Sequence, residues 1–132
     1  MAKAKTYLGS VESDRGNYGA AGALLAEAIE LSASSEEPRR QAFALSMLGR
    51  MNLLCNDLDA AAKHLDASVE LAECDHWLAI LPWPQALRGE VQLASGDPAG
   101  AIDLLRHAFA RACQLGDPCW EGMSARGLAM VA

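Results

Sequence analysis

The chain has 132 residues, enough for one domain of ordinary size. Hydrophobic residues make up 52 %, many of them alanine, and only 5 % are aromatic. This composition favours closely packed helices over a β-sandwich, which is rich in β-branched and aromatic side chains. The net charge of −6 and the scattered Lys and Arg residues argue against direct nucleic-acid contact, because phosphate binding needs clustered basic residues.

The sequence shows no sign of membrane insertion or export. No apolar run approaches the roughly 20 residues that span a bilayer. The charged start of the chain is not followed by the apolar stretch of a secretory signal. We therefore expect a cytoplasmic protein without membrane contact.

The cysteines do not follow a disulfide or metal-binding pattern. They form no C-x-x-C pair, and four are few for a disulfide scaffold. We expect reduced, mostly buried thiols at all four positions: Cys55, Cys74, Cys113 and Cys119.

A turn signal recurs in chain order every forty residues, at Gly16-Asn17-Tyr18, Asn56-Asp57-Leu58 and Gly96-Asp97-Pro98. Internal repetition of this kind indicates stacked structural units. The same interval aligns a glycine before each turn and small or apolar residues after it: Gly9, Gly49, Gly89; Ala21, Ala61, Ala101; Leu25, Leu65, Leu105; Ala28, Ser68, Ala108.

Each unit predicts two antiparallel helices. The glycine of the first helix lies where the two helices cross, since a missing side chain permits close approach. The Gly or Asn of the turn accepts the left-handed conformation that ends a helix. Asn17, Asp57 and Asp97 are good N-caps for the second helix, and Pro98 suits its first position. In the second helix, apolar residues recur three and four apart and predict one buried stripe, represented by Ala21, Leu24, Leu25, Ala28, Ile29 and by Ala101, Leu104, Leu105, Ala108, Phe109.

The links between units are less regular. Residues 32–38 separate the first two units, with Ser35 as the expected N-cap of the next helix. Residues 74–76 mark the second break, and we expect the following helix to begin near Pro82 or Pro84, or to kink there. Gly116-Asp117-Pro118 opens a last helix.

The predicted fold is all-α: an α-α superhelix of about three helical hairpins plus one terminal helix. A single domain, 1–132, contains units at about 2–34, 36–74 and 76–115 and a partial unit at 117–132. Because the fourth unit is incomplete, we expect a fragment of a longer protein. We also expect the last helix to pack on unit three and to leave an apolar edge open to self-association as a homo-oligomer; its apolar residues are Trp120, Met123, Leu128, Met130 and Val131.

At these positions the chain resembles the tetratricopeptide-repeat (TPR) family. That family has Leu-Gly in the first helix, Gly-Asp/Asn-Tyr at the turn, and Ala, an apolar residue and Ala in the second helix. The first unit fits closely, whereas the later units lapse at Asn56, Leu58, Ser68 and Arg88. The period of forty exceeds the family's ~34 residues. This long form of the repeat, together with the sequence of residues 112–117 and the Trp that follows it, is similar to the sensor regions of bacterial transcriptional regulators of the LuxR and maltose-activator types.

The resemblance implies a concave groove lined by the first helix of each hairpin. Its residues would be Lys3, Thr6, Ser10, Phe43, Ser46, Arg50, Trp83, Ala86, Glu90, Met123, Arg126 and Met130. Trp and Arg are common at binding hot spots, and Met adapts to varied partners. Ordinary packing between helices is an equally good explanation for Phe43, Trp83 and Met123. The Lys/Asn clamp by which some members hold a carboxyl terminus is absent, so a chaperone-tail adaptor is not predicted.

No catalytic, metal or cofactor site is predicted. The spacing of Cys74, Asp75 and His76 is too tight for a usual metal site, and His64 and His107 lie at unequal repeat positions. The first hypothesis is a protein- or peptide-binding scaffold, as a sensor or oligomerisation segment of a transcriptional regulator. The alternatives are a small-molecule effector domain using Trp83, Arg50 and Arg126, and a non-catalytic subunit that assists an enzyme.

Overall fold

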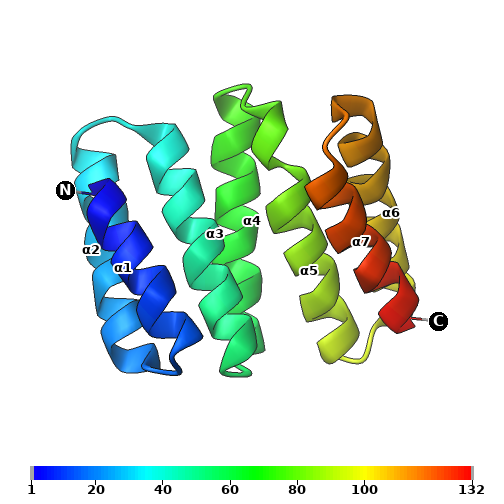
Figure 1. Cartoon of the computed structure of the whole chain (residues 1–132), viewed down its shortest axis with the longest axis horizontal. Helices are drawn as coiled ribbons and strands as arrows, with labels where there is room; N and C mark the ends of the chain where they lie inside the picture. The colour runs from blue at the N-terminus through cyan, green and yellow to red at the C-terminus, as the bar shows by residue number, and fades with distance from the viewer. Residues whose placement is uncertain (1, 132) are drawn as a thin grey trace.

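The computed structural model describes residues 2–131 and confirms the all-α superhelix, with no strand among these residues. Three helical hairpins are followed by a terminal helix (Figure 1). The elements are α1 (Ala2–Asp14), α2 (Tyr18–Ser34), α3 (Pro38–Leu54), α4 (Leu58–Cys74), the short 3₁₀-helix η1 (Leu78–Ile80), α5 (Pro82–Ala94), α6 (Pro98–Leu115) and α7 (Pro118–Val131). None of these helices is long and apolar enough to cross a membrane.

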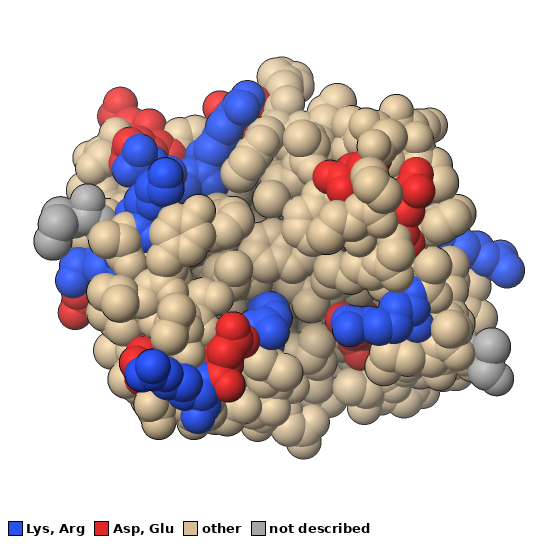
Figure 2. Space-filling view, viewed as in Figure 1, with Lys and Arg blue, Asp and Glu red and all other residues tan. Residues whose placement is uncertain are grey.

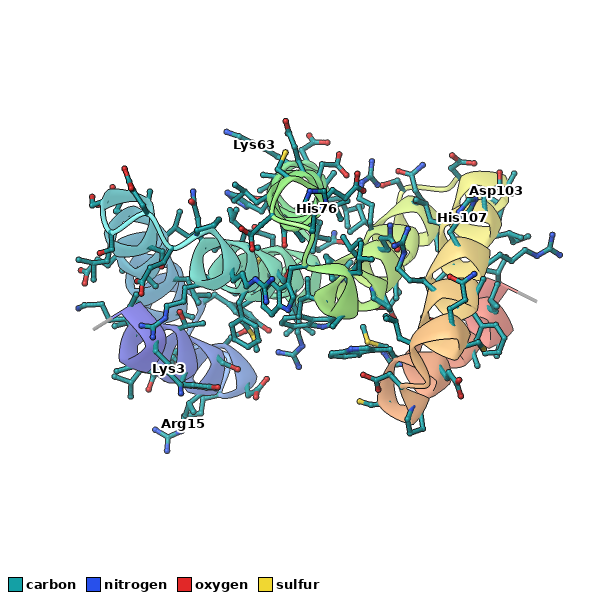
Figure 3. All side chains as sticks on the ribbon, turned by 90° about the horizontal axis from the view of Figure 1, so that it is seen from above. Lys3, Arg15, Lys63, His76, Asp103 and His107 are labelled. Atoms are coloured by element: carbon teal, nitrogen blue, oxygen red, sulfur yellow. The ribbon has the colours of Figure 1, made fainter. Side chains whose placement is uncertain are left out.

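The helices form two layers. Each helix packs on its neighbour in sequence, and α1, α3, α5 and α7 also contact one another in turn. Contacts among α2, α4 and α6 are sparse by comparison. The array therefore curves with the odd-numbered helices on its inner side, which faces the viewer in Figure 1 and lies at the bottom of Figure 3.

All six links between helices share one backbone geometry. A residue with positive φ occurs every twenty residues, at Gly16, Glu36, Asn56, His76, Gly96 and Gly116. At each link the next N–H donates to the carbonyl five residues earlier, over 2.8 to 3.1 Å, as in the Schellman motif. The forty-residue repeat therefore consists of two equal twenty-residue steps.

The expected helix boundaries are largely confirmed. Asp57 and Asp97 cap their helices by accepting the backbone N–H of Ala60 and Gly100, over 3.3 and 3.0 Å. Asn17 is also an N-cap position, but its side chain donates to Glu12 instead of capping. Helix α6 begins at Pro98 and α5 at Pro82, as expected.

One boundary expectation was wrong. Ser35 is the C-cap of α2 and not the N-cap of α3, a position that Glu37 occupies. Helix α2 runs to Ser34 because the left-handed residue Glu36 closes it in the same way as a glycine would. The link is therefore three residues long.

Each hairpin is closed by a glycine that lies against a leucine. A Cβ placed on Gly9, Gly49 or Gly89 would lie 2.7, 2.5 or 2.7 Å from the Cγ of Leu25, Leu65 or Leu105. Those three leucines are fully buried. The crossing predicted at these glycines is confirmed. The centre of the predicted stripe is fully buried, whereas Leu24, Ile29 and Leu104 are half-buried and Phe109 is 37 % exposed on the outer layer.

Helix α7 packs on the third hairpin, as expected. Gly127 lies against Leu105, where a Cβ would approach Cδ2 to 2.6 Å. Met123, Leu128 and Val131 pack against the same cluster, whereas Met130 is 56 % exposed. Met130 is therefore the one large apolar side chain within Pro118–Val131 that is exposed, and self-association through an apolar edge stays a prediction.

The expectation of mostly buried thiols was wrong. All four cysteines are free and exposed. Cys74 ends α4, Cys55 follows the end of α3, and Cys113 and Cys119 lie within α6 and α7. The buried positions of the outer helices α2, α4 and α6 are instead taken by Ala, Ser and Leu, which repeat at the forty-residue interval.

The glycine–leucine contact predicts the effect of adding one methyl group. Alanine is normally the better helix former by about 1 kcal/mol. In Gly49→Ala, however, the new Cβ would clash with Leu65, so we expect the free energy of unfolding to fall by about 1–3 kcal/mol. Gly122→Ala is the control, because nothing lies within 4 Å of its Cβ; it should gain about 0.5–1 kcal/mol. Urea unfolding measures both, and equal stability of the two variants would contradict the packing described.

Two left-handed residues are neither Gly nor Asn, and replacing them by glycine should stabilise the protein. Glu36 and His76 have φ of +52° and +54°, a conformation that costs an L-residue about 1–2 kcal/mol. Glu36→Gly and His76→Gly should each raise the free energy of unfolding by up to about 1 kcal/mol, after the entropy cost of glycine. Glu30→Gly, at an exposed site within α2, should lower it by about 1 kcal/mol. Thermal unfolding, followed by circular dichroism, measures the stability of the three variants. A loss of stability in all three would show that the backbone at Glu36 and His76 is not strained.

Candidate binding groove

A row of aromatic rings crosses the inner face. Tyr7 on α1 lies 6.2 Å from Phe43 on α3, measured between ring centroids. Phe43 lies 5.3 Å from Trp83 on α5, and Trp83 stacks on Trp120 of α7 at 5.7 Å with an angle of 10° between the rings. Such pairs stabilise the packing beyond the area they bury. Four successive inner helices thus contribute one ring each.

The rings differ in how open they are. Tyr7 is 53 % exposed, whereas Trp83 is 6 % exposed because it belongs to the apolar core cluster against which Phe43 and Trp120 also pack. Phe43 and Trp120 are half-buried. A partner can therefore reach the two ends of the row and the edge of Phe43, while Trp83 acts mainly as the support between them.

Ion pairs join neighbouring inner helices. Arg50 of α3 donates to Asp14 of α1 over 2.9 Å, and Arg126 of α7 donates to Glu90 of α5 over 3.3 Å. Both pairs link residues 36 apart on adjacent inner helices. The two arginines that the sequence placed in the groove are thus on the inner face, with their charges partly neutralised within the chain.

Several groove residues expected from the sequence are interior instead. Ser46 is fully buried; its hydroxyl lies 2.7 Å from that of Ser68, which donates to the carbonyl of Ala42 over 2.7 Å. Thr6 is 4 % exposed and donates to the carbonyl of Ala2. Ala86 is 1 % exposed. Ser46 and Ala86 lie between neighbouring helices and hold them together. Thr6 bonds within α1 and borders a pocket at the α1 end of the groove.

The remaining expected residues lie at or near the surface. Lys3 and Met130 are exposed, and Ser10 and Met123 are half-buried. Sequence reasoning missed Tyr7 as a groove residue, and it placed Trp120 only in the apolar set of the last helix. Their spacings from Phe43 and Trp83, 36 and 37 residues, differ from the forty-residue repeat. The aromatic character of both residues was the available signal.

A pocket opens at the α1 end of the groove. Its volume is about 230 Å³. The lining residues come from α1, from the first turns of α3 and from the link after α4: Lys3, Thr6, Tyr7, Arg39, Arg40, Phe43 and Trp77. Figure 2 shows Lys and Arg side chains gathered on this part of the inner face, over α1 and the start of α3.

Two further titratable groups, His64 and Asp75, make contacts outside the aromatic row. Among residues 2–131, no three His, Cys, Asp or Glu side chains are grouped so that they could hold a metal ion. Asp75 pairs with Arg39 over 2.7 Å. Burial, followed by the charge of Lys63, lowers the pKa of His64, which hydrogen-bonds to Asn52 over 2.8 Å. These contacts give His64 and Asp75 structural roles.

No protein-family model matches the chain, and no curated protein sequence matches it. The fold and the inner face define its class: an α-helical repeat protein whose odd-numbered helices build a concave, aromatic surface.

The buried serine pair predicts a coupled loss of stability. Ser68→Ala leaves the Ser46 hydroxyl buried without its partner and should cost about 1–3 kcal/mol. Ser46→Ala should cost less, about 0.5–1.5 kcal/mol, because Ser68 keeps its bond to Ala42. The double variant should be more stable than the sum of the two losses predicts. Urea unfolding of the four proteins measures this coupling, and strictly additive losses would argue against a shared hydrogen bond.

Proposed function

We propose that this chain is a TPR-type interaction module that binds a peptide segment of a partner protein along its concave face. The observation that carries this proposal is the row of four aromatic rings on four successive inner helices, spaced 5.3 to 6.2 Å apart. Tyr and Trp contribute strongly to binding because they bury large areas and have few torsions to immobilise.

The family assignment is part of the proposal. It is supported by the Leu-Gly and turn pattern of the sequence and by the Gly49–Leu65 type of contact within every hairpin. The forty-residue period supports the long form of the repeat. On that basis we propose a cytoplasmic, non-enzymatic role as the sensor or oligomerisation segment of a bacterial transcriptional regulator.

The charges of the inner face favour a partner that binds chiefly by apolar and aromatic contact. Arg50 and Arg126 are engaged by Asp14 and Glu90, so they offer little unpaired charge along the middle and the far end of the groove. Exposed pairs of this kind contribute at most about 1 kcal/mol each. The partner's affinity would therefore come from side chains placed against Tyr7, Phe43 and Trp120.

A small-molecule effector site enclosed by Trp83, Arg50 and Arg126 is less well supported, because Trp83 is only 6 % exposed and packs against two other rings. Both arginines already pair with acids of the chain. A small molecule would need a different place on this protein.

Selection from a peptide library tests the proposed function. Peptides of about twelve residues, which span about 40 Å when extended, are selected on the full chain. Trp120→Ala and Tyr7→Ala, at opposite ends of the row, should each weaken the selected peptides at least about tenfold, the loss expected for a hot-spot residue. Isothermal titration calorimetry gives the affinities, and circular dichroism verifies that each variant keeps its helices.

The matched control is Phe109→Ala, which removes an aromatic ring from the outer helix α6, where it is 37 % exposed. It should leave peptide binding unchanged. If the library yields no binder, or if Phe109→Ala weakens binding as much as the two inner variants, the concave face is not the binding surface.

A further inference from the structure

The pocket at the α1 end of the groove combines aromatic walls with basic side chains. Tyr7 and Phe43 form one side with their rings inclined by 58°, and Trp77 adds a third ring from the link after α4. Lys3, Arg39 and Arg40 supply three positive charges. Two of these cations and Trp77 come from outside the groove positions that the family resemblance implies.

Arg39 is held in place by two contacts. Its Nε lies 2.7 Å from the carboxylate of Asp75, and its guanidinium group lies over the Trp77 ring, 5.6 Å from the centroid. The ion pair engages the Nε side of the planar fork, so the terminal N–H groups keep donors for a ligand. A cation fixed in this way loses little side-chain entropy when it binds an anion.

The charge around the pocket is positive although the chain carries −6 overall. Asp75 pairs with Arg39, and Glu37 pairs with Arg40 over 3.5 Å. Lys3 has no acidic partner within 4.0 Å among residues 2–131. Three cations against two acids leave a net attraction for one negative charge, and the positive end of the α3 helix dipole adds to it.

The size of the pocket limits the ligand. Sites for drug-sized molecules usually hold about 300–1,000 Å³. A volume of about 230 Å³ suits one or two fused rings with a short charged group. The exposed Tyr7 and half-buried Phe43 and Trp77 offer faces for such rings.

We infer that this pocket binds a small aromatic carboxylate, with its rings against Tyr7, Phe43 and Trp77 and its carboxylate toward Lys3, Arg39 and Arg40. The pocket shares Tyr7 and Phe43 with the aromatic row, but Lys3, Arg39, Arg40 and Trp77 lie outside that row, so the inference also rests on residues that the proposed peptide binding does not use. It gives the chain a second binding site, for a metabolite-sized anion, at one end of the groove.

Calorimetric titration of the full chain with 1-naphthoate tests this inference. At low ionic strength we expect saturable binding with one site and Kd below about 1 mM. The neutral analogue 1-naphthalenemethanol should bind at least about tenfold more weakly, because it lacks the charge that the cations attract. 1-Naphthyl phosphate distinguishes the two anion classes: tighter binding than that of the naphthoate would overturn the assignment to a carboxylate.

Variants then locate the site. Lys3→Glu and Tyr7→Ala should each weaken 1-naphthoate at least about tenfold. Lys63→Glu is the matched control, since Lys63 is exposed on α4, on the opposite side of the array from Lys3 (Figure 3). Trp120→Ala should also leave 1-naphthoate binding unchanged, although it should weaken peptide binding. This variant therefore tests the two proposed binding sites separately.

Several results would overturn the inference. These are no saturable binding of 1-naphthoate, equal affinity for the neutral analogue, or an equal loss in Lys3→Glu and Lys63→Glu. Binding that persists unchanged in about 1 M salt, where the Debye length is about 3 Å, would also contradict a charge-directed site.

Discussion

The contact between an inner-helix glycine and an outer-helix leucine determines how each hairpin closes. Gly9, Gly49 and Gly89 have no Cβ, so the two helices approach until the leucine fills the space at the crossing. Close packing of this kind fixes the distance between the layers, because protein interiors leave no room for an added methyl group. Three equal hairpins stack regularly for this reason, and α7 approaches Leu105 through Gly127 on the same principle.

The six evenly spaced left-handed residues give that packing the shape of a curved surface. A left-handed residue every twenty positions returns each helix antiparallel to the last, so all odd-numbered helices fall on one side. Contact among these helices, with sparser contact among the even-numbered ones, places them on the inside of the curve. The groove and its aromatic row exist because of this arrangement, since each ring comes from a different helix.

The spacing of contacts explains which site residues sequence reasoning found. Equivalent positions of the repeat are forty residues apart. The contacts between neighbouring inner helices, however, join residues that are 36 apart: Asp14 and Arg50, Glu90 and Arg126, Tyr7 and Phe43. The difference of four residues is about one helical turn, or about 6 Å along the axis. Neighbouring inner helices therefore meet with an offset that alignment of the repeats does not contain. Residues placed by register alone, such as Ser46, were found in the interior, whereas Tyr7 was missed.

The sequence by itself determined the helices, the crossing glycines, the turns at Gly16, Asn56 and Gly96, and thus the stacked hairpins. These features depend on local backbone preferences and on a periodic apolar stripe, and both can be recognised from the order of the residues alone. Only the tertiary structure decided that the cysteines are exposed, that Glu36 and His76 are left-handed, and which inner side chains stay open. Accessibility depends on what neighbouring helices cover, and the pocket joins residues from three separate segments.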